Sequence, residues 1–192
     1  GLVSCHLKRE GERLTVALEM VPACLTIQQQ TLQSDGRTYQ ADLGFVGGFL
    51  LLFEADQLDF PLDKAFSQKI VDLGEELIAA ANQQWDVLHP WTGQEASVDG
   101  VVFYDSRSHR ERQGRGAVVY GEAHLDRSPC GTGTTVKMAL LERQGLLQVG
   151  QRFVNQGLLE TSFTGVLQDL VQVGDFSGVQ VSLEGRAHLV AF

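Results

Sequence analysis

A single thiol in a glycine-rich turn carries the clearest chemical signal of this 192-residue chain. Cys130 follows a proline, precedes Gly-Thr-Gly and stands before a helix-like segment. The first N–H groups of a helix lack partners within it, so such a turn is suited to hold a carboxylate, and the helix dipole there favours thiolate over thiol. The pattern predicts acid/base chemistry by Cys130 on a small anion, with the thiol facing an open groove.

The neighbours of Cys130 have types that fit the binding of such an anion. Gly131, Thr132 and Gly133 are predicted to bind its carboxylate through N–H groups and the Thr132 hydroxyl, with a plain helix cap as the alternative. Asp126 is predicted to accept a hydrogen bond from a substrate ammonium group, with a turn-forming role as the alternative. A buried structural thiol is the alternative for Cys130 itself.

Strands and two helices must position this turn. Apolar residues recur at spacings of three and four over residues 62–85, which predicts a long amphipathic helix, and residues 134–144 suit a second, shorter one capped by Gly145. Residues 106–114 are polar and are predicted to form an exposed loop. Apolar and alternating runs predict strands near 2–7, 13–18, 21–25, 39–43, 49–53, 98–104, 116–120, 152–155, 158–167, 170–173, 180–183 and 187–190.

These elements predict one α+β domain over residues 1–192, with an antiparallel sheet curled around a central helix. A net charge of -9 and a pI near 4.9 argue against a nucleic-acid partner. The longest apolar stretch, residues 45–53, is far short of the roughly 20 residues of a membrane span, so we expect a cytoplasmic protein without a membrane partner.

The cysteine pattern favours free thiols in a reducing compartment. Cys5, Cys24 and Cys130 make an odd number without metal-ligand spacing, which argues against a disulfide framework or a zinc site. Cys5 and Cys24 stand in strand-like surroundings and are predicted to be inert core residues.

Residues 126–134 read Asp-Arg-Ser-Pro-Cys-Gly-Thr-Gly-Thr, and this run resembles the motif around the second catalytic cysteine of proline racemases and 4-hydroxyproline 2-epimerases. Looser similarity extends over nearly the whole chain, for example at Gly100-Val101-Val102-Phe103-Tyr104-Asp105 and Glu160-Thr161-Ser162-Phe163-Thr164-Gly165. The chain departs from the family where Val46 replaces a usual Gly and Leu50 a usual Tyr, which puts the substrate in doubt.

The resemblance implies a diaminopimelate-epimerase-like fold, in which two similar domains close over a substrate. It also implies cofactor-free inversion at the α-carbon of an imino acid by two cysteines, one on each face of the substrate. Cys130 would be one of them, and Asp126 would bind the ring ammonium. No Met-Cys-Gly-His motif for the other is present, so we expect this chain to be the second domain, with a missing N-terminal domain as partner. A naturally minimal protein is the alternative, and a homodimer is a further partner to consider.

The resemblance leaves the substrate and reaction partly open. The expected substrate is 4-hydroxyproline, then proline. A dehydratase of trans-3-hydroxyproline is an alternative, although such enzymes usually carry Thr at the position of Cys130. A domain that binds an imino acid or a partner protein without turnover is another alternative.

Overall fold

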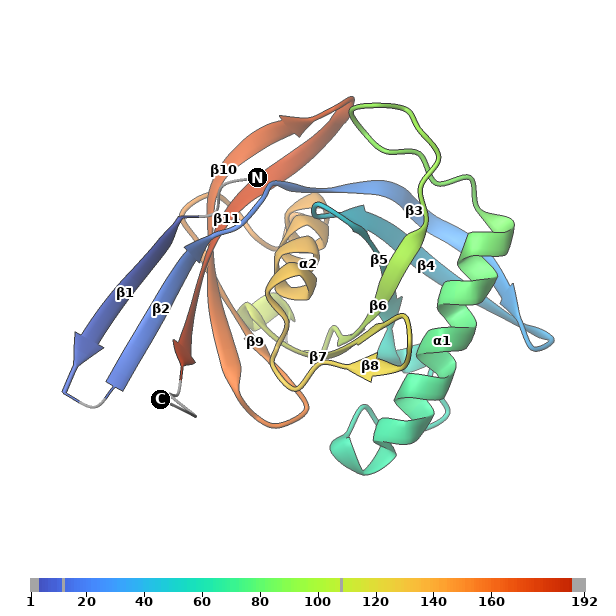
Figure 1. The fold of residues 1–192 in the computed structure, drawn as a ribbon, viewed down its shortest axis with the longest axis horizontal. Coiled ribbons are helices and arrows are strands. Elements are labelled where there is room, and N and C mark those ends of the chain that lie inside the picture. Colours follow the sequence, from blue (N-terminus) through green and yellow to red (C-terminus); the bar gives the residue numbers. More distant parts are fainter. Residues whose placement is uncertain (1–3, 12, 108, 188–192) are drawn as a thin grey trace.

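The computed structural model describes residues 4–11, 13–107 and 109–187, and their strands form one 11-stranded sheet (Figure 1). The helices are α1 (Ser67–Gln84) and α2 (Gly131–Arg143), with 3-10 turns η1 (Ala55–Gln57), η2 (Lys64–Phe66) and η3 (His109–Glu111). The strands are β1 (Cys5–Glu10), β2 (Arg13–Glu19), β3 (Ala23–Ser34), β4 (Arg37–Phe45), β5 (Phe49–Glu54), β6 (Val98–Asp105), β7 (Gln113–Tyr120), β8 (His124–Leu125), β9 (Arg152–Gln156), β10 (Ser162–Val173) and β11 (Phe176–Ala187).

The sheet closes into a barrel. Its neighbour order is β1-β2-β11-β10-β9-β7-β6-β5-β4-β3, and β8 pairs with β7. Gly178 and Val179 of β11 also pair with Cys24 and Ala23 of β3, which joins the two ends of the path from β11 to β3. The hairpin of β1 and β2 extends the sheet beyond this closure and projects from the body (Figure 1).

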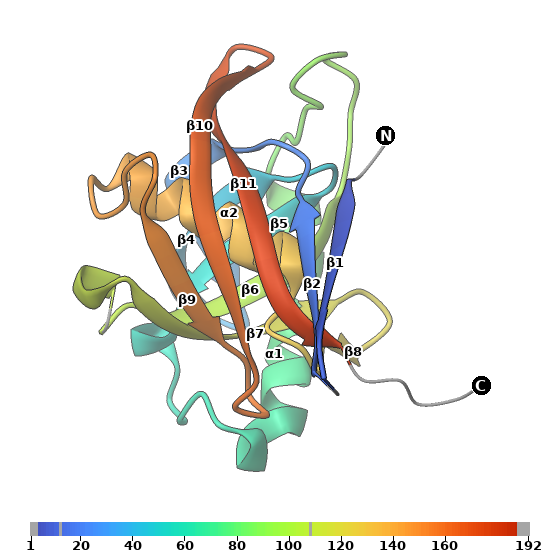
Figure 2. The same cartoon turned by 90° about the vertical axis from the view of Figure 1, so that its left-hand side faces the viewer.

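Two helical crossovers place one helix on each side of the sheet. α1 connects β5 to β6 and lies outside the barrel, whereas α2 connects β7 to β9 and lies inside it (Figures 1 and 2). Both strand pairs, β5 with β6 and β7 with β9, are parallel, as strands joined by a helical crossover are. The predicted antiparallel sheet is therefore a mixed sheet, because these two pairs are parallel. A sheet curled around a helix is confirmed.

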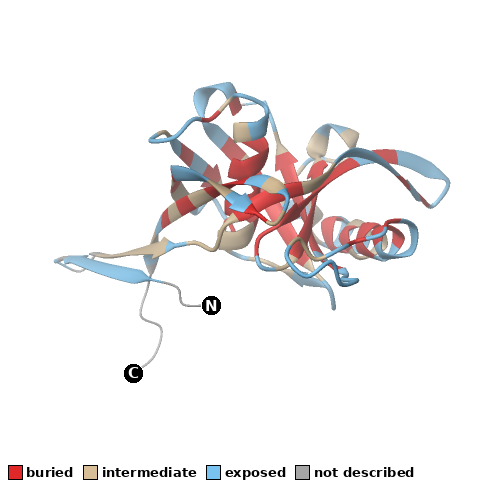
Figure 3. Cartoon of the chain, turned by 90° about the horizontal axis from the view of Figure 1, so that it is seen from above, coloured by how far each residue is buried: buried red, intermediate tan, exposed pale blue. Residues whose placement is uncertain are grey.

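Strands between the two helices are buried on both faces. Phe49, Leu51 and Phe53 of β5 pack in the core with α1, while Leu50 and Leu52 pack in the core with α2. This explains the continuous apolar run of β5. Figure 3 shows the same contrast along the molecule, with a buried centre and a β1–β2 hairpin that is exposed or half-buried.

Most predicted elements are present, with shifted bounds. α1 begins at Ser67 rather than at 62, and α2 begins at Gly131, directly after the thiol, rather than at 134. One continuous strand, β10, replaces the strands predicted at 158–167 and 170–173. Residues 2, 3 and 188–190 of the predicted strands lie outside the described residues.

Two predictions of burial were wrong. Cys5 is exposed because it lies on the projecting hairpin, whereas Cys24 is buried as expected. In the loop predicted to be exposed, His109 is buried because its ring stacks on Tyr104 and meets Phe153 edge-on. No helix among the described residues has both the length and the apolar character needed to cross a membrane.

Candidate active site

Cys130 is the N-cap residue of α2. Its backbone has φ of 61° and ψ of 122°, a conformation that costs energy in a residue other than glycine. This conformation turns the side chain over the first turn of the helix, where Sγ accepts a hydrogen bond from the N–H of Gly133 at 3.2 Å. The predicted arrangement of a thiol at a helix N-terminus is confirmed.

Two hydroxyl groups complete the surroundings of the sulfur. Tyr120, the last residue of β7, places its hydroxyl 3.0 Å from the Sγ of Cys130 and 2.8 Å from the Oγ1 of Thr132. The Thr132 hydroxyl lies 3.3 Å from the same sulfur. Sequence reasoning missed Tyr120, because only the pairing of β7 shows that its ring faces α2.

The predicted carboxylate cradle is partly occupied by the protein. The N–H of Gly133 is used by the sulfur, and that of Thr134 bonds the carbonyl of Cys130. The N–H groups of Gly131 and Thr132 have no acceptor in the described part of the chain, as expected for the first two helical residues. Both residues are half-buried. These two N–H groups and the Thr132 hydroxyl remain as donors for an anion.

Asp126 braces the turn through Ser128. Its Oδ1 accepts hydrogen bonds from the N–H of Ser128 at 2.8 Å and from the Ser128 hydroxyl at 2.9 Å. The Ser128 oxygen in turn accepts the N–H of Cys130 at 3.0 Å. Asp126 thus has the turn-forming role that was the alternative to binding an ammonium group, and its second carboxylate oxygen has no bond among the described residues.

A buried polar network supports the turn from behind. Asn155 of β9 donates through Nδ2 to the carbonyl of Pro129 at 3.2 Å and to the Oγ1 of Thr134 at 2.9 Å. The Nζ of Lys137 donates to Oδ1 of Asn155 at 2.9 Å and to the carbonyl of Arg115 at 3.2 Å. Lys137 is fully buried on α2, and burial lowers its pKa to about 7. A lysine between Val136 and the apolar residues 138–141 was the one sequence signal of this network.

The sulfur is more enclosed than predicted. Cys130 is only 2% exposed, and burial raises the pKa of its thiol, assisted by the charge of Asp126. Hydrogen bonds from Thr132, Tyr120 and Gly133 lower that pKa but do not outweigh burial. The expectation that the helix N-terminus makes thiolate the favoured form in an open groove is therefore not met in this structure, because desolvation of the charge is the larger effect.

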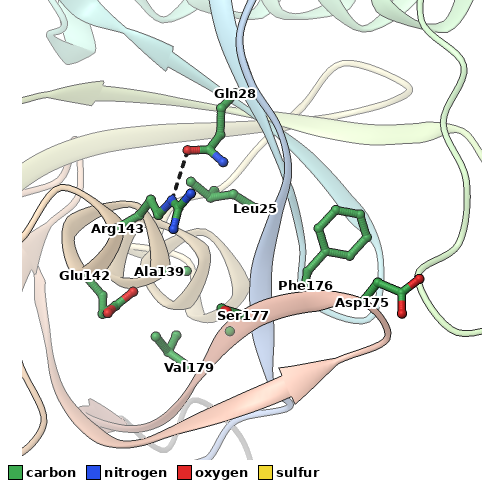
Figure 4. A pocket seen from close by; sticks show the side chains of 10 residues that line it. Leu25, Gln28, Ala139, Glu142, Arg143, Asp175, Phe176, Ser177 and Val179 are labelled. Carbon is green, nitrogen blue, oxygen red and sulfur yellow. Dashed lines mark hydrogen bonds between the residues drawn. The ribbon is translucent and has the colours of Figure 1, made fainter.

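A pocket lies near the first turn of α2, because one of its lining residues, Met20, lies beside Gly131. A Cβ on Gly131 would lie 3.4 Å from the Cε of Met20, and Met20 also lines a pocket of about 510 Å³ with Glu19, Gln180 and Ser182. A different pocket, of about 220 Å³, lies at the other end of α2 (Figure 4). It contains none of the predicted site residues, and its lining includes Gln28, Glu142, Arg143, Asp175 and Phe176.

The comparisons with known proteins agree with the motif. The family model described as proline racemase matches residues 1–192. The chain belongs to the proline racemase family. It is 32% identical over 184 residues to the proline racemase of Clostridioides difficile, which covers 95% of this chain and 55% of that protein. It is 28% identical over 194 residues to a trans-3-hydroxy-L-proline dehydratase of Azospirillum brasilense, which covers 100% of this chain and 58% of that protein.

The fold is shared with a solved structure. A hydroxyproline epimerase from Agrobacterium vitis, crystallised with bound trans-4-OH-L-proline, superposes with a TM-score of 0.87 at 27% identity, covering 97% of this chain and 54% of that one. The present chain thus spans about half the length of the relatives that it matches.

Proposed function

We propose that this chain supplies one of the two acid/base groups of a cofactor-independent racemase or epimerase that acts at the α-carbon of a cyclic imino acid. The observation that carries the proposal is the position of Cys130, whose sulfur lies against the first turn of α2 beside two N–H groups that have no acceptor among the described residues. The name of the Agrobacterium relative supports 4-hydroxyproline as the first substrate to test, and that of the Clostridioides relative supports proline as the second.

In the proposed reaction, the substrate carboxylate binds the N–H groups of Gly131 and Thr132 and the Thr132 hydroxyl. These donors stabilise the charge that spreads onto the carboxylate as the α-carbon loses its proton. The Gly133 N–H, bonded to Sγ, stabilises the thiolate instead of the substrate. The free carboxylate oxygen of Asp126 is the acceptor that we assign to the ring ammonium.

The proton balance of the reaction needs two groups. The Cys130 thiolate takes the α-proton of one enantiomer and becomes a thiol, while a thiol on the opposite face gives its proton to the planar carbanion and becomes a thiolate. Cys5 is exposed on the hairpin of β1 and β2, and Cys24 is buried in the core with α1, whereas Cys130 is buried in the core with α2, so we assign the second thiol to a domain outside this sequence. Residues 1–192 are then the second, diaminopimelate-epimerase-like half of a two-domain cytoplasmic enzyme.

Enclosure of Cys130 is the feature that the proposal must accommodate. Burial favours the neutral thiol, which is the form that returns a proton, and the hydrogen bonds from Thr132, Tyr120 and Gly133 oppose that preference. A substrate must also reach the sulfur of Cys130, which is 2% exposed, so the atoms that cover it must move.

Exchange of the substrate α-proton with solvent deuterium tests the proposal. The L and D forms of 4-hydroxyproline and proline are incubated in deuterium oxide with the complete gene product and separately with the 192 residues, and exchange is followed by NMR. We expect Cys130→Ser to abolish exchange from at least one enantiomer in the complete product, whereas the matched variant Cys5→Ser retains it, because Cys5 is exposed on the hairpin.

Four results would contradict the proposal. Unchanged exchange in Cys130→Ser removes the role of the thiol, and racemisation by the 192 residues alone removes the need for a second domain. Loss of water from trans-3-hydroxyproline without exchange of the other substrates favours the second candidate, a dehydratase, which the Azospirillum relative supports. Binding without exchange or dehydration would leave a non-catalytic imino-acid domain.

A further inference from the structure

Tyr120 is the one described side chain from another element whose hydroxyl meets both Cys130 and Thr132. The position of its ring is set by the sheet. Tyr120 pairs with Gly100 of β6 and with His124 of β8. A Cβ at position 100 would lie 3.1 Å from Cδ1 of Tyr120 and 2.8 Å from the carbonyl of Val119, so glycine there leaves the ring its space.

Inward orientation of Tyr120 follows from the alternation of β7. Ala117 and Val119 face the core with α1, whereas Val118 faces the core with α2, and Tyr120 continues that inner row. The hydroxyl is therefore held at the N-terminus of α2 by backbone pairing on both edges of its strand. It does not depend on a flexible loop for its position.

A count of protons shows why this hydroxyl matters. When the sulfur is a thiolate, only the two hydroxyl groups supply protons, one each, yet the three groups make three contacts, namely between the two hydroxyls and from each hydroxyl to the sulfur. In the proposed reaction the Thr132 proton turns to the substrate carboxylate. The Tyr120 proton is then free to point at the sulfur, and together with the Gly133 N–H it gives the thiolate two donors.

We infer that Tyr120 is a positioning residue whose hydroxyl donates to the Cys130 thiolate and releases Thr132 for the substrate. The inference rests on the proposed function, because it assigns Thr132 to the substrate carboxylate. Asp126 is the charged group that acts on both Tyr120 and Cys130, and its negative charge disfavours thiolate, so the neutral donors must supply the stabilisation.

Tyr120 stays a donor over the working range of an enzyme. Burial, followed by the neighbouring Cys130, raises the pKa of the Tyr120 hydroxyl above its usual value of 10. The phenol therefore keeps its proton through the neutral pH range and stays available as a donor.

The test is the pH dependence of alkylation of Cys130 in Tyr120→Phe. The 192-residue chain is treated with iodoacetamide from pH 6 to 11, and the modified peptide is measured by mass spectrometry. A hydrogen bond to a charged group contributes about 1.5–3 kcal/mol, so we expect the midpoint to move up by one pH unit or more, which is about tenfold less thiolate at a given lower pH. If the alkylation rate at high pH changes but the midpoint pH does not, the substitution has altered only the access of iodoacetamide to Cys130. That result would overturn the inference.

The control is Tyr39→Phe, which removes the hydroxyl of another buried tyrosine, in the other core. It should leave the midpoint of Cys130 unchanged, and an equal shift in both variants would assign the effect to general loosening and overturn the inference. If Tyr120→Phe fails to fold, replacement of Tyr120 by 3-fluorotyrosine keeps the shape and strengthens the donor. That replacement must lower the midpoint, and a midpoint that stays or rises contradicts the role.

Measurements of turnover distinguish failure of this inference from failure of the proposed function. In the complete gene product, Tyr120→Phe should move upward in pH the limb of the rate profile that reports the Cys130 thiolate. A shifted alkylation midpoint in a protein that exchanges no imino-acid proton supports the thiolate donor but contradicts the proposed reaction. An unshifted midpoint in an active racemase contradicts Tyr120 and leaves the reaction in place.

Discussion

Cys24 and Cys130 are both buried thiols, yet their surroundings differ in hydrogen-bond donors. Burial raises the pKa of Cys24 to about 11, opposed only by a backbone hydrogen bond of Phe45. At Cys130 the same penalty is opposed by Thr132, Tyr120 and Gly133. What distinguishes the candidate catalytic thiol is therefore the set of donors aimed at its sulfur, because exposure is negligible at both positions.

Lys137 provides a prediction at the same scale, because its ammonium group is enclosed beneath the turn. Burial lowers its pKa from the usual 10.5 to about 7, with Glu54 and Asp105 opposing the shift. Between these values the unfolded chain binds the proton and the folded chain does not, so the free energy of unfolding rises with pH through that window. Below pH 7 both states hold the proton, and the full cost of burying the charge is present.

We expect Lys137→Met to remove this slope. Both proteins are unfolded with urea from pH 6 to 9. Above pH 7, the free energy of unfolding of the wild-type protein should rise relative to that of the variant by up to about 1.4 kcal/mol per pH unit. Lys69→Met is the matched control, since Lys69 is exposed on α1 and should give a difference that does not vary with pH. Parallel curves for the wild-type protein and Lys137→Met would show that the buried amine does not titrate in this range.

At the scale of the element, the two glycines in the first turn of α2 differ in the space around them. A Cβ on Gly133 would lie 2.7 Å from Cγ2 of Val118 and 3.3 Å from the Sγ of Cys130. A Cβ on Gly131 would meet only the ends of flexible side chains, at 3.4 Å or more. Gly133 is thus required for the approach of α2 to β7, whereas Gly131 has room for a methyl group.

The matched variants Gly133→Ala and Gly131→Ala test this difference by thermal unfolding. Overpacking costs about 1–3 kcal/mol, so Gly133→Ala should lower the melting temperature by several degrees. Gly131→Ala should leave it unchanged or slightly raised, because alanine has the better helix propensity. Equal loss in both variants would mean that the turn tolerates no added methyl group, and that the packing against Val118 is not the reason.

The elements show which parts of the site a sequence can reveal. Cys130, Thr132 and the glycines are local, so the motif and the helix-opening turn predict their arrangement. Tyr120 and Asn155 reach the turn from β7 and β9, whose parallel pairing depends on the crossover through α2. The parallel pairs and the burial of His109 were missed for the same reason, because periodicity within a segment does not specify its neighbours.

At the scale of the whole molecule, the barrel depends on a short closure between β3 and β11. Gly178 pairs with Cys24, and a Cβ there would lie 2.5 Å from the carbonyl of Ala23 and 2.9 Å from Cγ2 of Val173. The nearest atom is a backbone carbonyl oxygen, which cannot move away by a change of rotamer as a side chain can. A methyl group at position 178 must therefore separate the two strands that enclose α2.

We expect Gly178→Ala to lower the free energy of unfolding by about 1–3 kcal/mol and to speed hydrogen exchange in β3 and β11 before β6. Gly121→Ala is the control, because a Cβ at position 121 meets nothing within 4 Å. Since α2 is held by the closed sheet, Gly178→Ala should also raise the alkylation rate of Cys130 through increased opening of the barrel. Equal exchange in the two variants would show that β11 and β3 are not the closure on which the enclosure of the thiol depends.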